Sequence, residues 1–166
     1  MKLADKNYAF RPPASLKEVE GFEKKYGIEL PDEYRSFLLN VADGGIMLDN
    51  FPLLSLRDLE VNKGIVQREF PFSDYWIWED EDDIDEAKIK EIEYGNLALI
   101  DIGCAQTWNL ILHGKCAGEM WCFTDVGIQP ACPRRGFLSW FEYWLDGGDD
   151  YFSDFTYGSV LLIDSG

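Results

Sequence analysis

Apolar residues recur at helical spacing near the N-terminus of the chain. Four of them lie three or four positions apart, as on the buried face of a helix: Leu16, Val19, Phe22 and Tyr26. In front of them, Ser15 and Glu18 have the spacing of a capping box, in which a hydroxyl and a carboxylate satisfy free backbone N–H groups. The pattern predicts a helix that begins after Ser15 and ends at Gly27.

A second amphipathic pattern follows directly. Pro31 and Asp32 are typical of a first helical turn, where the missing proline N–H is harmless and a carboxylate is favourable to the helix dipole. Its apolar stripe is Tyr34, Phe37, Leu38 and Val41. This predicts a second helix that ends at the run Asp43–Gly45, because glycine supplies the left-handed conformation of a helix C-terminus.

The pattern changes after Gly45 to short apolar runs. Three of these runs predict strands: Leu97–Ile102, Thr107–Leu112 and Glu119–Thr124. The intervening residues 113–118 contain two glycines and predict a hairpin loop. Less regular signals indicate a short helix at Ser55–Leu59, a strand at Tyr75–Trp78 and a helix between Ile84 and Ile92.

The last regular pattern is aromatic and helical, with Phe137, Trp140, Phe141 and Trp144 on one stripe of the segment 137–145. The order along the chain is therefore N-terminal helices, a mainly antiparallel sheet and a C-terminal aromatic helix. This arrangement predicts an α+β fold rather than an alternating parallel one.

Composition adds the expectation of one domain. The chain has 166 residues, of which 46% are hydrophobic and 15% aromatic, enough for a core of its own. We expect a single domain over residues 1–166, with a core of about 14–146, an acidic insertion at 79–93 and a tail at 149–166. No apolar run is long enough for a membrane span and no secretory signal is evident, so the expected location is the cytoplasm, with all four cysteines reduced.

Charge is distributed unevenly along the chain. The net charge is −16, yet residues 1–40 are neutral, so the whole excess lies beyond them. Such a field repels nucleic acid and anionic membranes and attracts a basic protein. Acidity that serves only solubility is the competing explanation.

The insertion 79–93 is the candidate functional site. It holds nine carboxylates and two lysines, and concentrated like charges do little for folding. We predict that a basic protein surface binds here. The carboxylates expected to steer the partner are Asp80, Glu81, Asp82, Asp83 and Asp85, with Trp76 and Trp78 as the anchors that touch it. A solvated loop with both tryptophans in the core is the alternative.

Other chemistries have weaker support. A calcium loop that starts at Asp80 would place Ile84 at a ligand position, so calcium is not expected. The set His113, Cys116, Cys122 and Cys132 lacks a paired zinc knuckle, and no metal or other cofactor is predicted. The chain has one histidine and no nucleophile elbow or phosphate-binding glycine motif, which favours a protein without catalytic activity.

Several segments together resemble the SUKH superfamily of cell-wall-synthesis regulators and bacterial immunity proteins. They are Tyr26–Leu39 with its Leu-Pro step, Asp43–Gly45, Gly95–Asp101, Asn109–Leu112, Gly118–Trp121 and Phe137–Trp144. The resemblance implies an immunity protein that binds and neutralises a cognate toxin domain, with nucleases among the toxins concerned. A regulatory scaffold of the cell-wall-synthesis type is the alternative. Neither the acidic insertion nor the tail is part of the resemblance.

Overall fold

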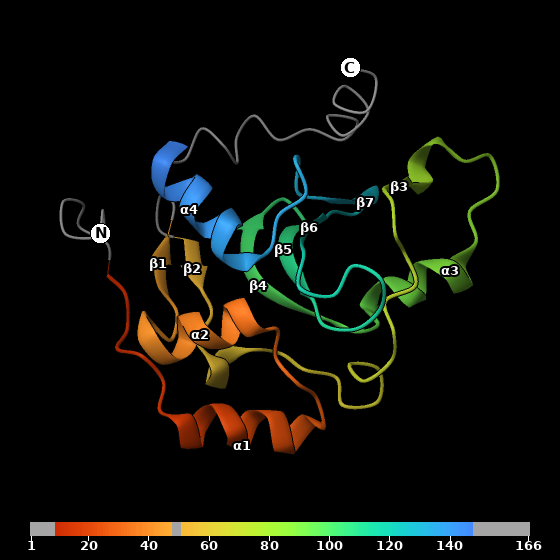
Figure 1. Cartoon of the computed structure of the whole chain (residues 1–166). Helices are drawn as coiled ribbons and strands as arrows, with labels where there is room; N and C mark the ends of the chain where they lie inside the picture. Colours follow the sequence, from red (N-terminus) through yellow and green to blue (C-terminus); the bar gives the residue numbers. More distant parts are fainter. Residues whose placement is uncertain (1–8, 48–50, 148–166) are drawn as a thin grey trace.

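The computed structural model describes residues 9–47 and 51–147, so the predicted tail at 149–166 lies outside the described residues. Within these ranges the chain forms helices and one antiparallel sheet (Figure 1). The α-helices are α1 (Leu16–Tyr26), α2 (Asp32–Asn40), α3 (Glu86–Lys90) and α4 (Phe137–Gly147). The strands are β1 (Gly45–Met47), β2 (Phe51–Leu53), β3 (Trp76–Ile77), β4 (Asn96–Gly103), β5 (Gln106–Ile111), β6 (Met120–Phe123) and β7 (Gly127–Pro130). The predicted α+β fold is confirmed.

The sheet has seven strands in the order β1-β2-β4-β5-β6-β7-β3, and every neighbouring pair is antiparallel. Strands β4 to β7 form a meander in which each strand pairs with the next one along the chain. The two-residue strand β3 joins the far edge through Trp76 opposite Ile128. The segment that precedes the acidic residues is therefore built into the sheet.

Each face of the sheet carries its own core, because side chains alternate between the faces of a strand. On the face covered by α1, α2 and α4, strands β5 and β6 contribute Trp108, Leu110, Met120 and Cys122. On the opposite face the same strands contribute Ile111, Trp121 and Phe123 to a smaller core with Phe70, Phe72, Trp76, Trp78 and Ile128. The smaller core holds the segment that leads into the acidic residues.

The predicted cap of α1 is present. The Ser15 hydroxyl oxygen accepts a hydrogen bond from the Glu18 N–H at 3.2 Å, and the Glu18 carboxylate accepts one from the Ser15 N–H at 2.7 Å. The bond from the Ser15 N–H, together with one that the Ser15 hydroxyl donates to the Glu18 carboxylate at 2.9 Å, lowers the pKa of Glu18, because both favour its charged form. Leu16 remains 52% exposed, so the buried stripe of the helix begins at Val19.

Helix α2 packs its buried stripe against α4. The rings of Tyr34 and Phe37 meet the ring of Phe137 with centroids 5.0 and 4.9 Å apart. The Glu33 carboxylate accepts a hydrogen bond from the Leu138 N–H at 3.0 Å, so a side chain of α2 caps the first turn of α4. Helix α2 ends at Asn40, earlier than the predicted glycine stop, and Val41 follows it as the C-cap.

The short strands β1 and β2 were not predicted, and three further elements differ from the sequence prediction. Strand β7 was not predicted, because its four residues include a glycine and a proline. The predicted strand Tyr75–Trp78 shortens to two residues, since Trp78 begins a 3₁₀ turn. The helix expected between Ile84 and Ile92 is a five-residue α-helix followed by a 3₁₀ turn.

Of the helices in the described ranges, none has the length and apolar character to cross a membrane.

Candidate functional site: an acidic loop braced by buried tryptophans

The carboxylates of the predicted site lie together on one exposed loop. Residues 79–86, called the acidic loop below, are all exposed and connect β3 to the start of α3. Its acidic side chains are Glu79, Asp80, Glu81, Asp82, Asp83, Asp85 and Glu86. In Figure 1 the loop lies beyond β3 at the end of the sheet that is remote from α1. The structure thus brings the predicted carboxylates together.

The two predicted anchors are in the core instead of on the surface. Trp76 is 8% exposed and Trp78 7%, and their ring centroids are 5.1 Å apart. Trp76 also stacks on Phe72 at 5.6 Å and an interplanar angle of 11°. The structure thus agrees with the alternative placement of both tryptophans in the core, and their contact with a partner stays a prediction.

Both indoles nevertheless hold the acidic loop in place through their N–H groups. The Trp76 Nε1–H donates to the Glu81 carboxylate at 2.6 Å, and the Trp78 Nε1–H donates to the Asp125 backbone oxygen at 2.9 Å. The Lys88 ammonium lies 4.0 Å from the Trp76 ring centroid, within range of a cation–π interaction. The base of the loop is therefore attached to the sheet and to α3.

The far end of the loop is fixed by Asp85. Its carboxylate accepts hydrogen bonds from the N–H groups of Ala87 and Lys88 at 3.0 and 3.2 Å and caps α3. Of the predicted carboxylates, Glu81 and Asp85 consequently have structural roles.

The remaining acidic side chains of the loop have no bonding partner in the described chain. In the described chain, no hydrogen bond or ion pair involves the side chains of Glu79, Asp80, Asp82, Asp83 or Glu86. Their carboxylates can accept charge-assisted hydrogen bonds from arginine or lysine without breaking an existing contact. The loop therefore presents unpaired negative charge on a fastened backbone.

The cysteines and the histidine show no arrangement for metal chemistry. Across residues 9–47 and 51–147, no three His, Cys, Asp or Glu side chains form a group that could hold a metal ion. Burial raises the pKa of the Cys122 thiol to about 12, and burial also raises that of Cys116, whose sulfur lies 3.5 Å from an Arg134 guanidinium nitrogen. Both thiols are held in the protonated form, which is a poor nucleophile and a poor ligand.

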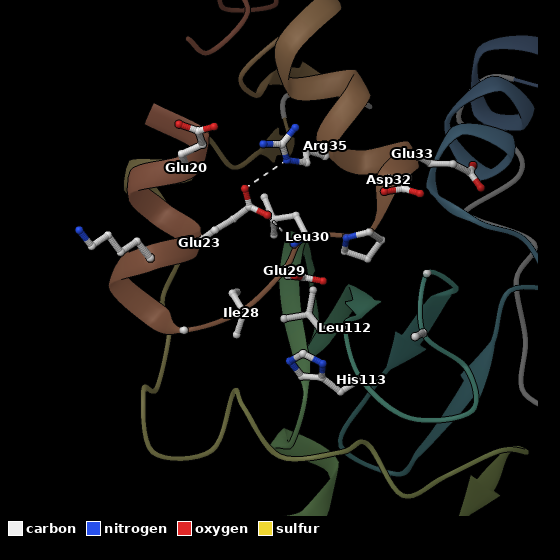
Figure 2. A pocket seen from close by; sticks show the side chains of 15 residues that line it. Glu20, Glu23, Ile28, Glu29, Leu30, Asp32, Glu33, Arg35, Leu112 and His113 are labelled. Atoms are coloured by element: carbon white, nitrogen blue, oxygen red, sulfur yellow. Dashed lines mark hydrogen bonds and ion pairs between the residues drawn. The ribbon is translucent and has the colours of Figure 1, made fainter. Parts of the chain in front are cut away.

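A separate concave surface lies between α1 and the loop after β5 (Figure 2). This helix–hairpin groove has a volume of about 1150 Å³, and its wall includes residues 27–33, which join α1 to α2 and form the start of α2. Ile28, Leu30 and Leu112 form its base, and each is at most 5% exposed. The imidazole of His113 lines the opposite wall.

Glu23 fixes the shape of the groove. Its carboxylate accepts a hydrogen bond from the Leu30 N–H at 3.0 Å and forms an ion pair with the Arg35 Nε at 3.1 Å. Both bonds appear as dashed lines in Figure 2. One side chain of α1 thus ties the joining segment to the second turn of α2.

No pattern in the sequence indicated this groove. Its carboxylates come from residues 1–40, where equal numbers of basic and acidic residues give a neutral sum. Several of the basic residues are used elsewhere: Lys25 lies 4.9 Å from the Tyr26 ring centroid and Arg11 pairs with Asp58 at 3.4 Å. The excess of acid at the groove appears only once the chain is folded.

Comparison with known proteins identifies the family. The family model described as SMI1 / KNR4 family (SUKH-1) matches residues 13–152, most of the chain. The chain belongs to the SUKH-1 family. A relative is the "Uncharacterized protein YnaB" of Bacillus subtilis strain 168, 35% identical over 57 residues, which cover 34% of this chain and 39% of YnaB. The chain thus aligns with well under half of that relative, and no solved structure matches it.

The family resemblance has a structural explanation. The signature residues of the Leu-Pro segment are core residues: Leu30, Tyr34, Phe37 and Leu38 are at most 3% exposed. Pro31 occupies the N-cap of α2, and Gly44 has a φ of +79° beside the backbone of Leu53–Ser55. The residues that carry the SUKH-1 resemblance therefore specify packing and turns.

Proposed function

We propose that this SUKH-1 domain is a non-catalytic immunity protein that acts in the cytoplasm. It binds a cognate toxin domain and neutralises it by covering its functional surface. Membership of the family supports the general class of protein-binding domain, and the acidic loop supports the chemistry of the partner. The partner surface in this proposal is rich in arginine and lysine.

The observation that carries the proposal is the contrast between the fastened base of the acidic loop and its uncommitted carboxylates. A loop held by the Trp76–Glu81 bond and the Asp85 cap loses little conformational entropy when a partner binds. Its negative charge accelerates encounter with a cationic surface and then forms charge-assisted hydrogen bonds with it. The structure thus supplies both a preorganised shape and an attractive field.

A nuclease fits these requirements. Proteins that bind nucleic acid do so largely with lysine and arginine side chains that neutralise phosphates. A carboxylate-rich loop can occupy such a surface in place of the phosphates and so exclude the substrate. The proposal requires only binding, and it assigns no catalytic residue to this chain.

Co-expression with a candidate toxin domain, taken from a gene next to that of this chain, tests the proposal. We expect the wild-type chain to restore growth of cells that express this domain and to form a stoichiometric complex on size-exclusion chromatography. A variant with Asp80→Asn, Asp82→Asn and Asp83→Asn is expected to restore growth less well.

Two results would count against different parts of the proposal. Absence of both rescue and complex would overturn the immunity function. A complex that forms equally well with the triple variant would retain the function and reject the acidic loop as the docking surface.

A further inference from the structure

The helix–hairpin groove has properties of a binding site that the acidic loop lacks. It is concave, it lies on a different part of the surface, and its walls come from α1, from the segment 27–33 and from the loop after β5 (Figure 2). The Glu23 bonds to Leu30 and Arg35 hold two of these walls together. The groove is therefore formed before any ligand arrives.

The polar groups of the groove divide into engaged and available ones. Glu23 is paired with Arg35, and the Glu33 carboxylate caps α4. Glu29 and Asp32 make no side-chain hydrogen bond or ion pair within the described chain, and both residues are exposed. Along the chain they lie on either side of the Leu30–Pro31 step, and Figure 2 shows both carboxylates. Glu20 and Lys24 of α1 also line the groove and carry opposite charges, so the available charge of the groove is negative.

The opposite wall contains an unsatisfied polar atom. The Nε2 of His113 is buried and has no hydrogen-bond partner among the described residues. Because this atom has almost no exposed surface, a ligand in the groove meets the imidazole ring of His113 and not its Nε2. The neighbouring rim is Gly118, which has a φ of +90° and no atom within 4 Å of the position that a side chain would occupy. This side of the groove is thus open to an incoming backbone.

We infer that the groove binds an extended, basic segment of a protein partner. Arginine or lysine side chains of the segment pair with Glu29 and Asp32, and its backbone lies along the His113 wall. The inference shares with the proposed function the premise of a cationic partner, but it assigns a second contact surface that the acidic loop does not provide. Charge complementarity selects a basic segment over an acidic or purely apolar one, because the base of the groove exposes little apolar surface.

A peptide titration followed by NMR tests the inference. The probe is a blocked pentapeptide, Arg-Gly-Arg-Gly-Arg, added to the full-length ¹⁵N-labelled chain at low salt, with Gln-Gly-Gln-Gly-Gln as the neutral control. We expect the arginine peptide to shift the amide signals of residues 27–32 and 113–118 and the ring signal of His113, which is the single histidine of the chain. The double variant Glu29→Gln and Asp32→Asn is expected to weaken this binding about tenfold.

A matched variant removes two exposed carboxylates elsewhere, through Glu69→Gln and Glu142→Gln. It is expected to leave the groove shifts and the affinity unchanged. Shifts confined to residues 79–86 would overturn the groove inference while leaving the acidic loop as a docking surface. Equal shifts with the neutral peptide, an equal loss of affinity in both double variants, or no shift in the groove would also overturn it.

Discussion

Replacing Glu81 by alanine tests whether the acidic loop is fastened to the core. The Glu81 carboxylate is the acceptor for the buried Trp76 indole, at 2.6 Å. The neighbouring Asp80 provides a matched control, since its side chain is exposed and has no partner in the described chain. Glu81→Ala and Asp80→Ala remove the same charge, and they differ only in the bond to the indole.

The magnitude follows from the environment of the indole. Trp76 is 8% exposed, so its N–H has little access to water once the acceptor is removed. An unsatisfied buried donor costs roughly 1–3 kcal/mol, and partial access of water at the base of the loop places the expected loss at about 1–2 kcal/mol. Asp80→Ala relieves like-charge repulsion in a segment of local charge −7, so its effect is expected to stay within about 0.5 kcal/mol of zero.

Urea unfolding, followed by tryptophan fluorescence, measures the free energy of unfolding of each variant. The comparison holds if the unfolding free energy depends on urea concentration with the same slope in both variants. Amide hydrogen exchange then reports on the loop itself, and we expect faster exchange of the Glu81 amide, which is bonded to the Trp78 oxygen at 3.1 Å, in Glu81→Ala alone. If the two variants unfold at the same urea concentration and exchange at the same rate, the indole does not hold the loop and the preorganisation argument fails.

Three further predictions concern the core. Glu33→Ala removes the cap of α4 and is expected to lower the unfolding free energy by about 1 kcal/mol. Glu142→Ala, on the exposed side of the same helix, should leave the unfolding free energy nearly unchanged. Equal effects of the two variants would show that Glu33 does not act as a cap. The exposed Cys104 should be alkylated by iodoacetamide well before the buried Cys122, as followed by mass spectrometry, and early labelling of Cys122 would contradict its burial. Burial raises the pKa of Cys122 to about 12, above the value of about 8.5 for an unfolded thiol, so the unfolded chain loses this proton first. The protonated Cys122 thiol therefore contributes its full stabilisation below pH ~8.5, and this stabilisation is lost as the pH rises toward 12. Cys122→Ala should flatten the decline of the unfolding free energy between about pH 8.5 and 10. An unchanged decline would show that Cys122 does not cause it.

Local patterns carried enough information to predict much of the fold. The capping box of Ser15 and Glu18 and the aromatic stripe of α4 each depend on residues close in sequence, and both are present in the structure. Strands β4, β5 and β6 were predicted within two residues at each end, because their apolar runs are bounded by turn residues. These elements do not depend on distant contacts for their type.

Features that depend on distant contacts were missed or left as alternatives. Trp76 and Trp78 precede a charged run, and their burial is caused by Phe72 and by strands β6 and β7, which lie more than 40 residues further along the chain. Strand β7 is defined by its neighbours β6 and β3 rather than by its own residues. The groove combines α1 with the loop after β5, so no window of the sequence contains it.

The rate of association with the toxin domain tests the central claim most directly. Stopped-flow measurements would compare three proteins across a range of salt concentrations: the wild type, the triple variant Asp80→Asn, Asp82→Asn and Asp83→Asn, and a control triple variant Glu60→Gln, Glu69→Gln and Glu142→Gln. We expect the acidic-loop variant to associate about tenfold more slowly at low salt, with a difference that shrinks near 1 M salt, where charges are screened within about 3 Å. Equal rates for the two triple variants at low salt would contradict the assignment of the acidic loop as the surface that meets the partner.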